Sequence, residues 1–144
     1  MAAFDLTPEE TLEQFRRGEP ETPWGEGRQH FESFLTQTAF SDHFDVELAG
    51  LFYRTIRCGL LHQSEAGGTS RLKRGGGYPL VAYTVDHAGI VINTRKFHDL
   101  LEHVINEYAT DLRNPTSATT REAFRRKMNY ICHIEGKEAK QDIA

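Results

Sequence analysis

The chain has 144 residues and a formal net charge of −4, a length that fits one domain with a buried core. It contains no apolar run long enough for a membrane-spanning helix, and its acidic start lacks the basic and apolar regions of a secretory signal. A general nucleic-acid coat is also excluded, because phosphate binding of that kind needs a positive field.

The two cysteines, Cys58 and Cys132, lie far apart in apolar stretches of the sequence. This arrangement favours buried thiols in a reducing compartment over a disulfide framework, and no Cys-x-x-Cys pair points to zinc. We therefore expect a cytoplasmic protein that needs no metal and no cofactor.

The first predicted element is a short helix that begins at the capping box Thr7-Pro8-Glu9-Glu10 and ends near Gly18. A linker rich in proline and glutamate follows. Residues 1–50 carry 11 acidic and 3 basic side chains, whereas residues 51–144 carry 10 acidic and 14 basic ones. We therefore predict that residues 1–26 form an acidic helix and linker. A solvated acidic lead-in is the alternative explanation of the uneven charge.

Two helices are predicted next. The first runs from about Gly27 to Ala39, and the second is capped by Asp42 and reaches roughly to His62. At 100° per residue, one sector of the second helix collects the side chains that we expect in the core: Leu48, Ala49, Phe52, Tyr53, Ile56, Gly59 and Leu60. The opposite face mixes Arg54, Arg57, Cys58, Leu61 and His62, which is typical of an interface or a site rather than of an ordinary solvated surface.

The glycine-rich stretch from Gln63 to Gly77 contains the basic group Arg71-Leu72-Lys73-Arg74 but not the residue order of a phosphate-binding P-loop. It is either a mobile loop or a basic flap over a substrate. Residues 80–85 and 90–92 then predict a small β-hairpin at about 79–93.

Two further helices follow the hairpin. The first is capped by Thr94 and ends near Asn114. The second runs from about Ser117 to His133, with a frayed tail over 136–144, and its expected core side chains are Phe124, Met128 and Ile131. The predicted fold is therefore mainly α: an up-down helical bundle over 27–135 with a small inserted β-hairpin.

The string FYRTIRCGLLHQSE, with Arg57 and His62 near the end of a long amphipathic helix, resembles the Arg-x4-His motif of the HEPN superfamily. These proteins are small helical bundles found in bacterial toxins, defence systems and RNA-processing proteins. The resemblance covers about residues 42–133, and its specific part is the motif helix. It implies metal-independent RNA cleavage at a homodimer interface, possible RNA binding and, for a toxin or defence protein, an antitoxin or defence partner.

The chemistry of the two side chains agrees with this implication. His62 can take the proton from a 2′-hydroxyl or give one to the leaving oxygen, and Arg57 can stabilise the charge that builds on the phosphoryl oxygens. Residues five apart on a straight helix point about 140° from each other, so the two groups converge only if two antiparallel copies share one cleft. Otherwise Arg57 is an ion-pair partner and His62 caps the helix end.

Two positions depart from the family pattern. Cys58 stands where active members often carry Asn, Asp or His, and Ser64 stands where some toxin members carry a tyrosine that is adenylylated. Arg54 and Glu65 are near enough to assist, and the basic group of Arg71, Lys73 and Arg74 could bind substrate. A non-catalytic HEPN-like module that binds RNA, a nucleotide or a protein is the main alternative, and a purely structural interaction protein is the third interpretation.

Weaker signals lie outside the motif helix. His98 and Glu102 are one helical turn apart and could begin a metal site, although surface pairing explains them as well. Three arginines, Arg121, Arg125 and Arg126, form a basic stripe on the last helix, which is either a phosphate contact or a solvated face.

Overall fold

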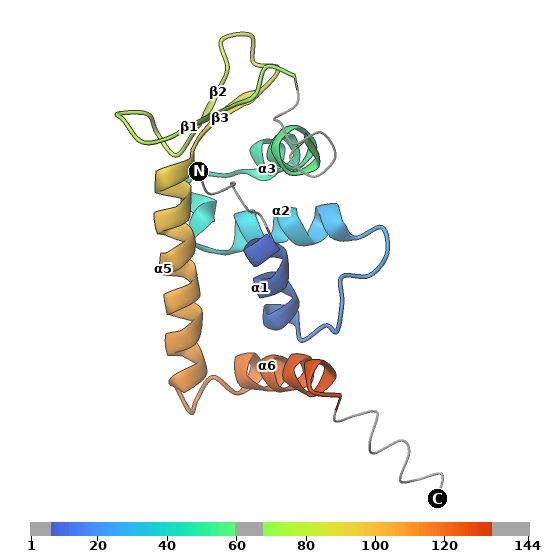
Figure 1. Ribbon diagram of the computed structural model, residues 1–144. Helices are drawn as coiled ribbons and strands as arrows, with labels where there is room; N and C mark the ends of the chain where they lie inside the picture. Colours follow the sequence, from blue (N-terminus) through green and yellow to red (C-terminus); the bar gives the residue numbers. More distant parts are fainter. Residues whose placement is uncertain (1–6, 60–67, 134–144) are drawn as a thin grey trace, which may run out of the picture.

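A computed structural model describes residues 7–59 and 68–133. The chain is mainly helical with one small β-sheet, as the sequence predicts. In Figure 1 the sheet lies at the top, helices α3, α2, α1 and α6 follow one below another, and α5 runs along one side from the sheet down to α6. Packing follows the same order, because α2 contacts both α3 and α1, and α1 contacts α6.

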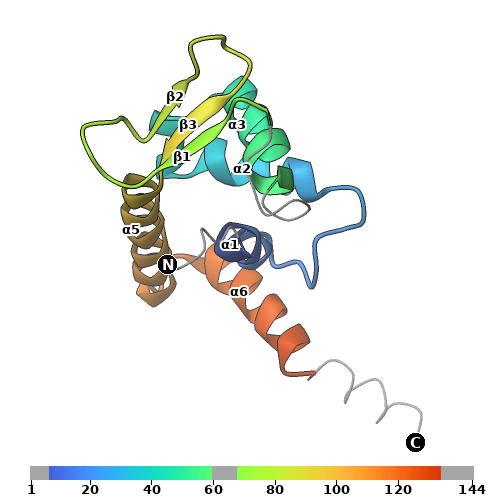
Figure 2. The same cartoon turned by 45° about the horizontal axis from the view of Figure 1, so that its top comes forward.

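The N-terminal helix α1 spans Thr7–Arg17 and ends where Gly18 adopts a φ of +68°, which is close to the predicted end. It packs on α2 (Gly27–Gln37) and on α6, and Leu12 joins the hydrophobic core. Within the described residues, this segment is therefore packed onto the domain and does not form a solvated lead-in. The bend of the chain that connects α1 and α2 is visible in Figure 2.

The motif helix begins later than predicted. A 3₁₀ turn, η1, occupies Ala39–Asp42, and Asp45 rather than Asp42 caps α3 (Val46–Phe52) by accepting a hydrogen bond from the Leu48 backbone amide. The helix then widens into a π-turn, η2, over Tyr53–Arg57 and continues through Gly59. Its expected core side chains, among the described residues, are buried or half-buried.

The sheet has three strands in the order β1-β3-β2, one more than the predicted hairpin. Strands β2 (Val81–Tyr83) and β3 (Ile90–Asn93) form that hairpin, and β1 (Arg71–Lys73) pairs with β3 in parallel. The interpretation of residues 71–73 as a mobile loop or flap was therefore wrong. Three residues with one apolar side chain give no periodic signal, and β1 is held instead by its ladder and by the buried Ser70.

Helix α5 (Thr94–Arg113) is capped by Asn93, which accepts a hydrogen bond from the Lys96 amide, rather than by Thr94. Helix α6 (Ala118–Ile131) turns Ala123 and Lys127 inward, whereas Ile131 is exposed, so the predicted core position of Ile131 was wrong. The partner surface of α6 is α1, where Phe124 stacks on Phe15 and the Lys127 ammonium group donates a hydrogen bond to the Gln14 side chain. Hydrophobic spacing alone could not show this preference for a lysine.

Phenylalanine rings form the centre of the core. Phe52 of α3 stacks on Phe31 of α2 at a centroid distance of 5.3 Å and on Phe97 of α5 at 5.5 Å, and Phe40 lies 4.8 Å from Phe97. This aromatic core, made of Phe31, Phe40, Phe52 and Phe97, joins α2, η1, α3 and α5 below the sheet. It fixes the position of the helix that carries Arg57.

No helix in the described ranges is long and apolar enough to cross a membrane. Both thiols are free, but they are less buried than we predicted: Cys58 is half-buried and Cys132 is exposed.

Candidate functional site

Arg57 lies at the end of the π-turn, where its guanidinium group is held from two sides. Its Nη2 donates a 2.8 Å hydrogen bond to Oε2 of Glu10 on α1, and its Cζ lies 5.4 Å from the ring centroid of Tyr53. The Arg57 side chain is 18% exposed and that of Glu10 is 27% exposed. Arg57 is thus neither in the aromatic core nor free in solution. It is an oriented, partly exposed cation between the π-turn and α1.

Tyr53 is the centre of this polar group. A Cβ added at Gly27, at the start of α2, would lie 3.4 Å from the Tyr53 hydroxyl and 4.0 Å from a carboxylate oxygen of Glu10. Burial raises the pKa of the Tyr53 phenol, and the charge of Arg57 opposes this rise. We call Glu10, Tyr53, Arg57 and Cys58 the Arg57 cluster, in which the Cys58 thiol also interacts with Tyr53.

Of the residues predicted to act with Arg57, the structure describes Arg54 but not His62 or Glu65. His62 and Glu65 lie outside the described residues, so the two expected catalytic side chains are not placed relative to each other. Arg54 is exposed three residues before Arg57 in the same π-turn, and its Nη1 lies 3.7 Å from the point where a Cβ at Gly50 would sit. The structure therefore places Arg54 beside Gly50 and Arg57 beside Glu10.

The basic group of β1 lies at the edge of the sheet. The Ser70 hydroxyl donates a 2.8 Å hydrogen bond to Thr55 of the π-turn, which anchors the start of β1 on the motif helix. Arg71 folds back onto the carbonyl of Ser70, and the Lys73 ammonium lies 5.6 Å from the ring centroid of Tyr78. Arg71, Lys73 and Arg74 are all exposed, as a substrate-binding role requires.

Sequence reasoning missed Glu10 and Arg28. Glu10 was explained by the capping box, and it is 47 residues away from Arg57. Arg28 stands on the next helix, where its Nε donates to Glu32 at 2.6 Å and its Nη2 lies 3.0 Å from a Cβ position at Gly50. No spacing in one sequence reports a contact between two helices, although the glycine inside an amphipathic helix could have indicated a close approach.

The other candidates are surface pairs. His98 and Glu102 are 3.6 Å apart on the exposed face of α5, and the described residues contain no group of three side chains that could hold a metal. On α6, Arg125 pairs with Glu122, and Arg126 donates to the carbonyl of Arg17 at the end of α1. The latter contact gives one arginine of the basic stripe a structural role.

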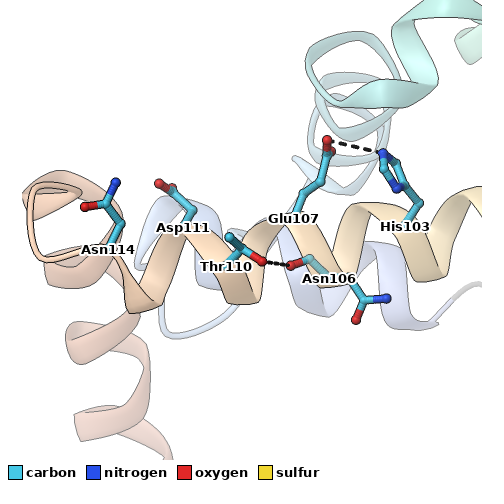
Figure 3. A pocket seen from close by; sticks show the side chains of 6 residues that line it. All are labelled: His103, Asn106, Glu107, Thr110, Asp111 and Asn114. Carbon is cyan, nitrogen blue, oxygen red and sulfur yellow. Dashed lines mark hydrogen bonds and ion pairs between the residues drawn. The ribbon is translucent and has the colours of Figure 1, made fainter.

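A hollow on the outer face of α5 is drawn in Figure 3, where six polar side chains line it. Its side chains come from α5 and its C-cap: His103, Asn106, Glu107, Thr110, Asp111 and Asn114. His103 pairs with Glu107 at 3.2 Å, and the Thr110 hydroxyl donates to the Asn106 carbonyl. One helix face cannot enclose a ligand, so we assign no site there.

Comparison with known proteins gives no match: no family model, no curated protein and no solved structure matches this chain.

Proposed function

We propose that the chain is a metal-independent endoribonuclease of the HEPN type that acts as a homodimer, with Arg57 and His62 at the shared site. The observation that carries the proposal is the Arg57 cluster. It presents a guanidinium group that Glu10 and Tyr53 orient at the rim of the motif helix. The π-turn beneath it supports the same conclusion, since such turns occur frequently at functional sites.

The contact with Glu10 is compatible with this role. A partly exposed ion pair contributes only about 0–1 kcal/mol to stability, so a phosphate group can replace the carboxylate as the partner of Arg57. In the reaction, the 2′-oxygen of a ribose attacks the adjacent phosphorus, and the bond from phosphorus to the 5′-oxygen breaks. His62 takes the 2′-hydroxyl proton and then passes it to the leaving 5′-oxygen, and Arg57 stabilises the phosphoryl oxygens. The products are a 2′,3′-cyclic phosphate and a 5′-hydroxyl.

The HEPN-like up-down bundle is part of this proposal, and so is a role in a toxin or defence system with a neutralising partner. Mainly helical architecture around the motif helix supports the fold. Two free cysteines support a reducing, cytoplasmic location.

The test is incubation of the purified protein with single-stranded RNA and with DNA of the same sequence in the presence of a chelator. We expect RNA cleavage and resistant DNA, and we expect Arg57→Ala and His62→Ala to abolish cleavage. His98→Ala and Arg125→Ala are matched controls, because both side chains are exposed and paired with a glutamate on their own helix. Sedimentation of each variant shows whether the dimer persists. Uncleaved RNA with the wild-type dimer, or full activity of either motif variant, would contradict the proposal.

One observation favours the second candidate, a non-catalytic HEPN-like module that binds RNA, a nucleotide or a protein. Arg57 already has a carboxylate partner within its own chain, which suffices to explain its place in the fold. RNA that binds to the protein without being cleaved in the same assay would select this candidate. A dimer that neither binds nor cleaves nucleic acid would leave the structural interpretation.

A further inference from the structure

Two further guanidinium groups, those of Arg28 and Arg54, lie close together beside the Arg57 cluster. Gly50 has no side chain, and an added Cβ would lie 3.0 Å from Nη2 of Arg28, 3.2 Å from Oε1 of Glu32 and 3.7 Å from Nη1 of Arg54. Arg28 comes from α2 and Arg54 from the π-turn, so two elements converge on one point. A glycine inside a helix costs roughly 0.5–1 kcal/mol relative to alanine. The close approach of the two side chains explains why glycine stands here.

The Glu32 carboxylate orients Arg28, as the Glu10 carboxylate orients Arg57. The Glu32 carboxylate accepts the Nε–H of Arg28 at 2.6 Å, which leaves the Nη groups of Arg28 directed over Gly50. The Arg28 side chain is 51% exposed and Arg54 is also exposed, so an anion can reach both. Two guanidinium groups against one carboxylate keep a positive charge at this point, and planar guanidinium groups match the geometry of phosphate oxygens.

The pair is continuous with the Arg57 cluster. The Tyr53 ring centroid lies 5.4 Å from Cζ of Arg57, and the Tyr53 hydroxyl would lie 3.4 Å from a Cβ at Gly27, the residue before Arg28. Gly50 and Arg57 are seven residues apart, which is about 10 Å along a helix axis. A chain of phosphates that has one group at Arg57 can therefore place a further group beside the exposed side chains of Arg28 and Arg54.

We infer that Arg28 and Arg54 form a phosphate clamp over Gly50 that binds the backbone of single-stranded RNA next to Arg57. The identity of the ligand rests on the proposed function, whereas the clamp itself rests on the convergence of the two side chains. The clamp binds the phosphodiester and not the base, so it adds affinity without sequence preference.

The experiment measures binding of a labelled, fully 2′-O-methylated single-stranded oligoribonucleotide, which the proposed reaction cannot cleave. We expect the double variant Arg28→Ala/Arg54→Ala to weaken binding about tenfold or more at low salt, since hydrogen bonds to charged groups are the strong ones. The slope of log affinity against log salt should fall by about 0.7 for the lost phosphate contact. Arg125→Ala is the matched control for a charge lost from an exposed helical arginine, and it should leave both values unchanged.

Gly50→Ala supplies a variant that keeps every charge. The added methyl group would displace the flexible ends of Arg28 and Glu32, while alanine favours the helix, so the variant should fold at least as stably as the wild type and bind the oligonucleotide less tightly. Binding by the double variant that equals the wild type, or no binding by the wild type, would overturn the clamp.

The outcomes separate the clamp from the nuclease. RNA cleavage with normal binding by the double variant overturns the clamp and leaves the proposed function. Weakened binding by the double variant, without any RNA cleavage by the wild type, supports the clamp in the non-catalytic module.

Discussion

The aromatic core and the polar contacts around α1 differ in how the sequence specifies them. The aromatic core is built from rings that follow helical spacing within each segment and meet across α2, α3 and α5. The contacts around α1 include Leu12 and the Phe15–Phe124 ring pair, but several of them join elements through charged and polar side chains, such as Glu10 to Arg57 and Lys127 to Gln14. The aromatic core holds the motif helix in place, and the contacts around α1 orient the partly exposed Arg57 side chain.

Removal of an aromatic side chain should have the largest effect on stability. Phe52→Ala deletes a fully buried ring that stacks on two others, so we expect the free energy of unfolding to fall by about 3–5 kcal/mol. Chemical denaturation measures this change. Val85→Ala, at an exposed turn position, should change it by less than about 0.5 kcal/mol. Equal effects of the two substitutions would mean that the aromatic core does not dominate the fold.

His30 tests whether buried polar groups near α1 also stabilise the fold. Both ring nitrogens of this buried side chain face acceptors, the Glu26 carbonyl and the Glu19 carboxylate, so His30 joins α2 to the linker after α1. We expect His30→Ala to lower the free energy of unfolding by about 2–4 kcal/mol, less than Phe52→Ala. The same denaturation assay on His98→Ala, an exposed histidine with a glutamate partner, should show almost no change. A loss no greater than that of His98→Ala would contradict a stabilising role.

Arg57 should separate function from stability. Because its ion pair with Glu10 is partly exposed, Arg57→Met should lower the free energy of unfolding by no more than about 1 kcal/mol. The same substitution should reduce RNA cleavage by a factor of about 100 or more, since it removes the charge that stabilises the phosphoryl oxygens. Thermal unfolding and the chelator assay measure the two effects on one sample. A large loss of stability with normal residual activity would assign Arg57 a structural role.

Asp86 should give the smallest effect, and one that depends on pH. A hydrogen bond from the Thr84 hydroxyl, together with others from the Ala88 amide and Thr69, lowers the pKa of the Asp86 carboxyl. Its ionised form therefore stabilises the folded hairpin fully above the ordinary carboxyl pKa, and this contribution is lost as the pH falls through the lowered value. The stability difference between the wild type and Asp86→Asn should shrink on acidification. A difference that stays constant down to acidic pH would contradict this linkage.

The difference between the aromatic core and the contacts around α1 also explains how much of the fold the sequence predicts. Hydrophobic periodicity predicted α2, the motif helix and α5, because apolar side chains repeat at helical spacing within each of these segments, around Phe31, Phe52 and Phe97 respectively. It misplaced Ile131, because α6 meets α1 through Phe124 and the buried Lys127 and leaves Ile131 exposed. Composition marked a turn-rich stretch before the hairpin but not β1, whose stability depends on the ladder to β3.

The candidate site shows the same limit. The sequence could single out Arg57 and Arg54 because their helix face mixes apolar and charged side chains, unlike an ordinary solvated surface. Glu10 pairs with Arg57, and Arg28 converges with Arg54 over Gly50, but both come from other helices. Helix packing brings these side chains close, and no local sequence pattern predicts that.

The proposed cleavage site, shared between two subunits, can be tested directly with two variants expected to be inactive, Arg57→Ala and His62→Ala. The two chains are unfolded together and refolded as mixed dimers, and RNA cleavage by the mixture is measured. A guanidinium from one subunit and an imidazole from the other should restore part of the wild-type rate in the mixture, and neither variant alone should show it. If native mass spectrometry detects mixed dimers and the mixture stays as inactive as its components, a cleavage site shared between the two chains is contradicted.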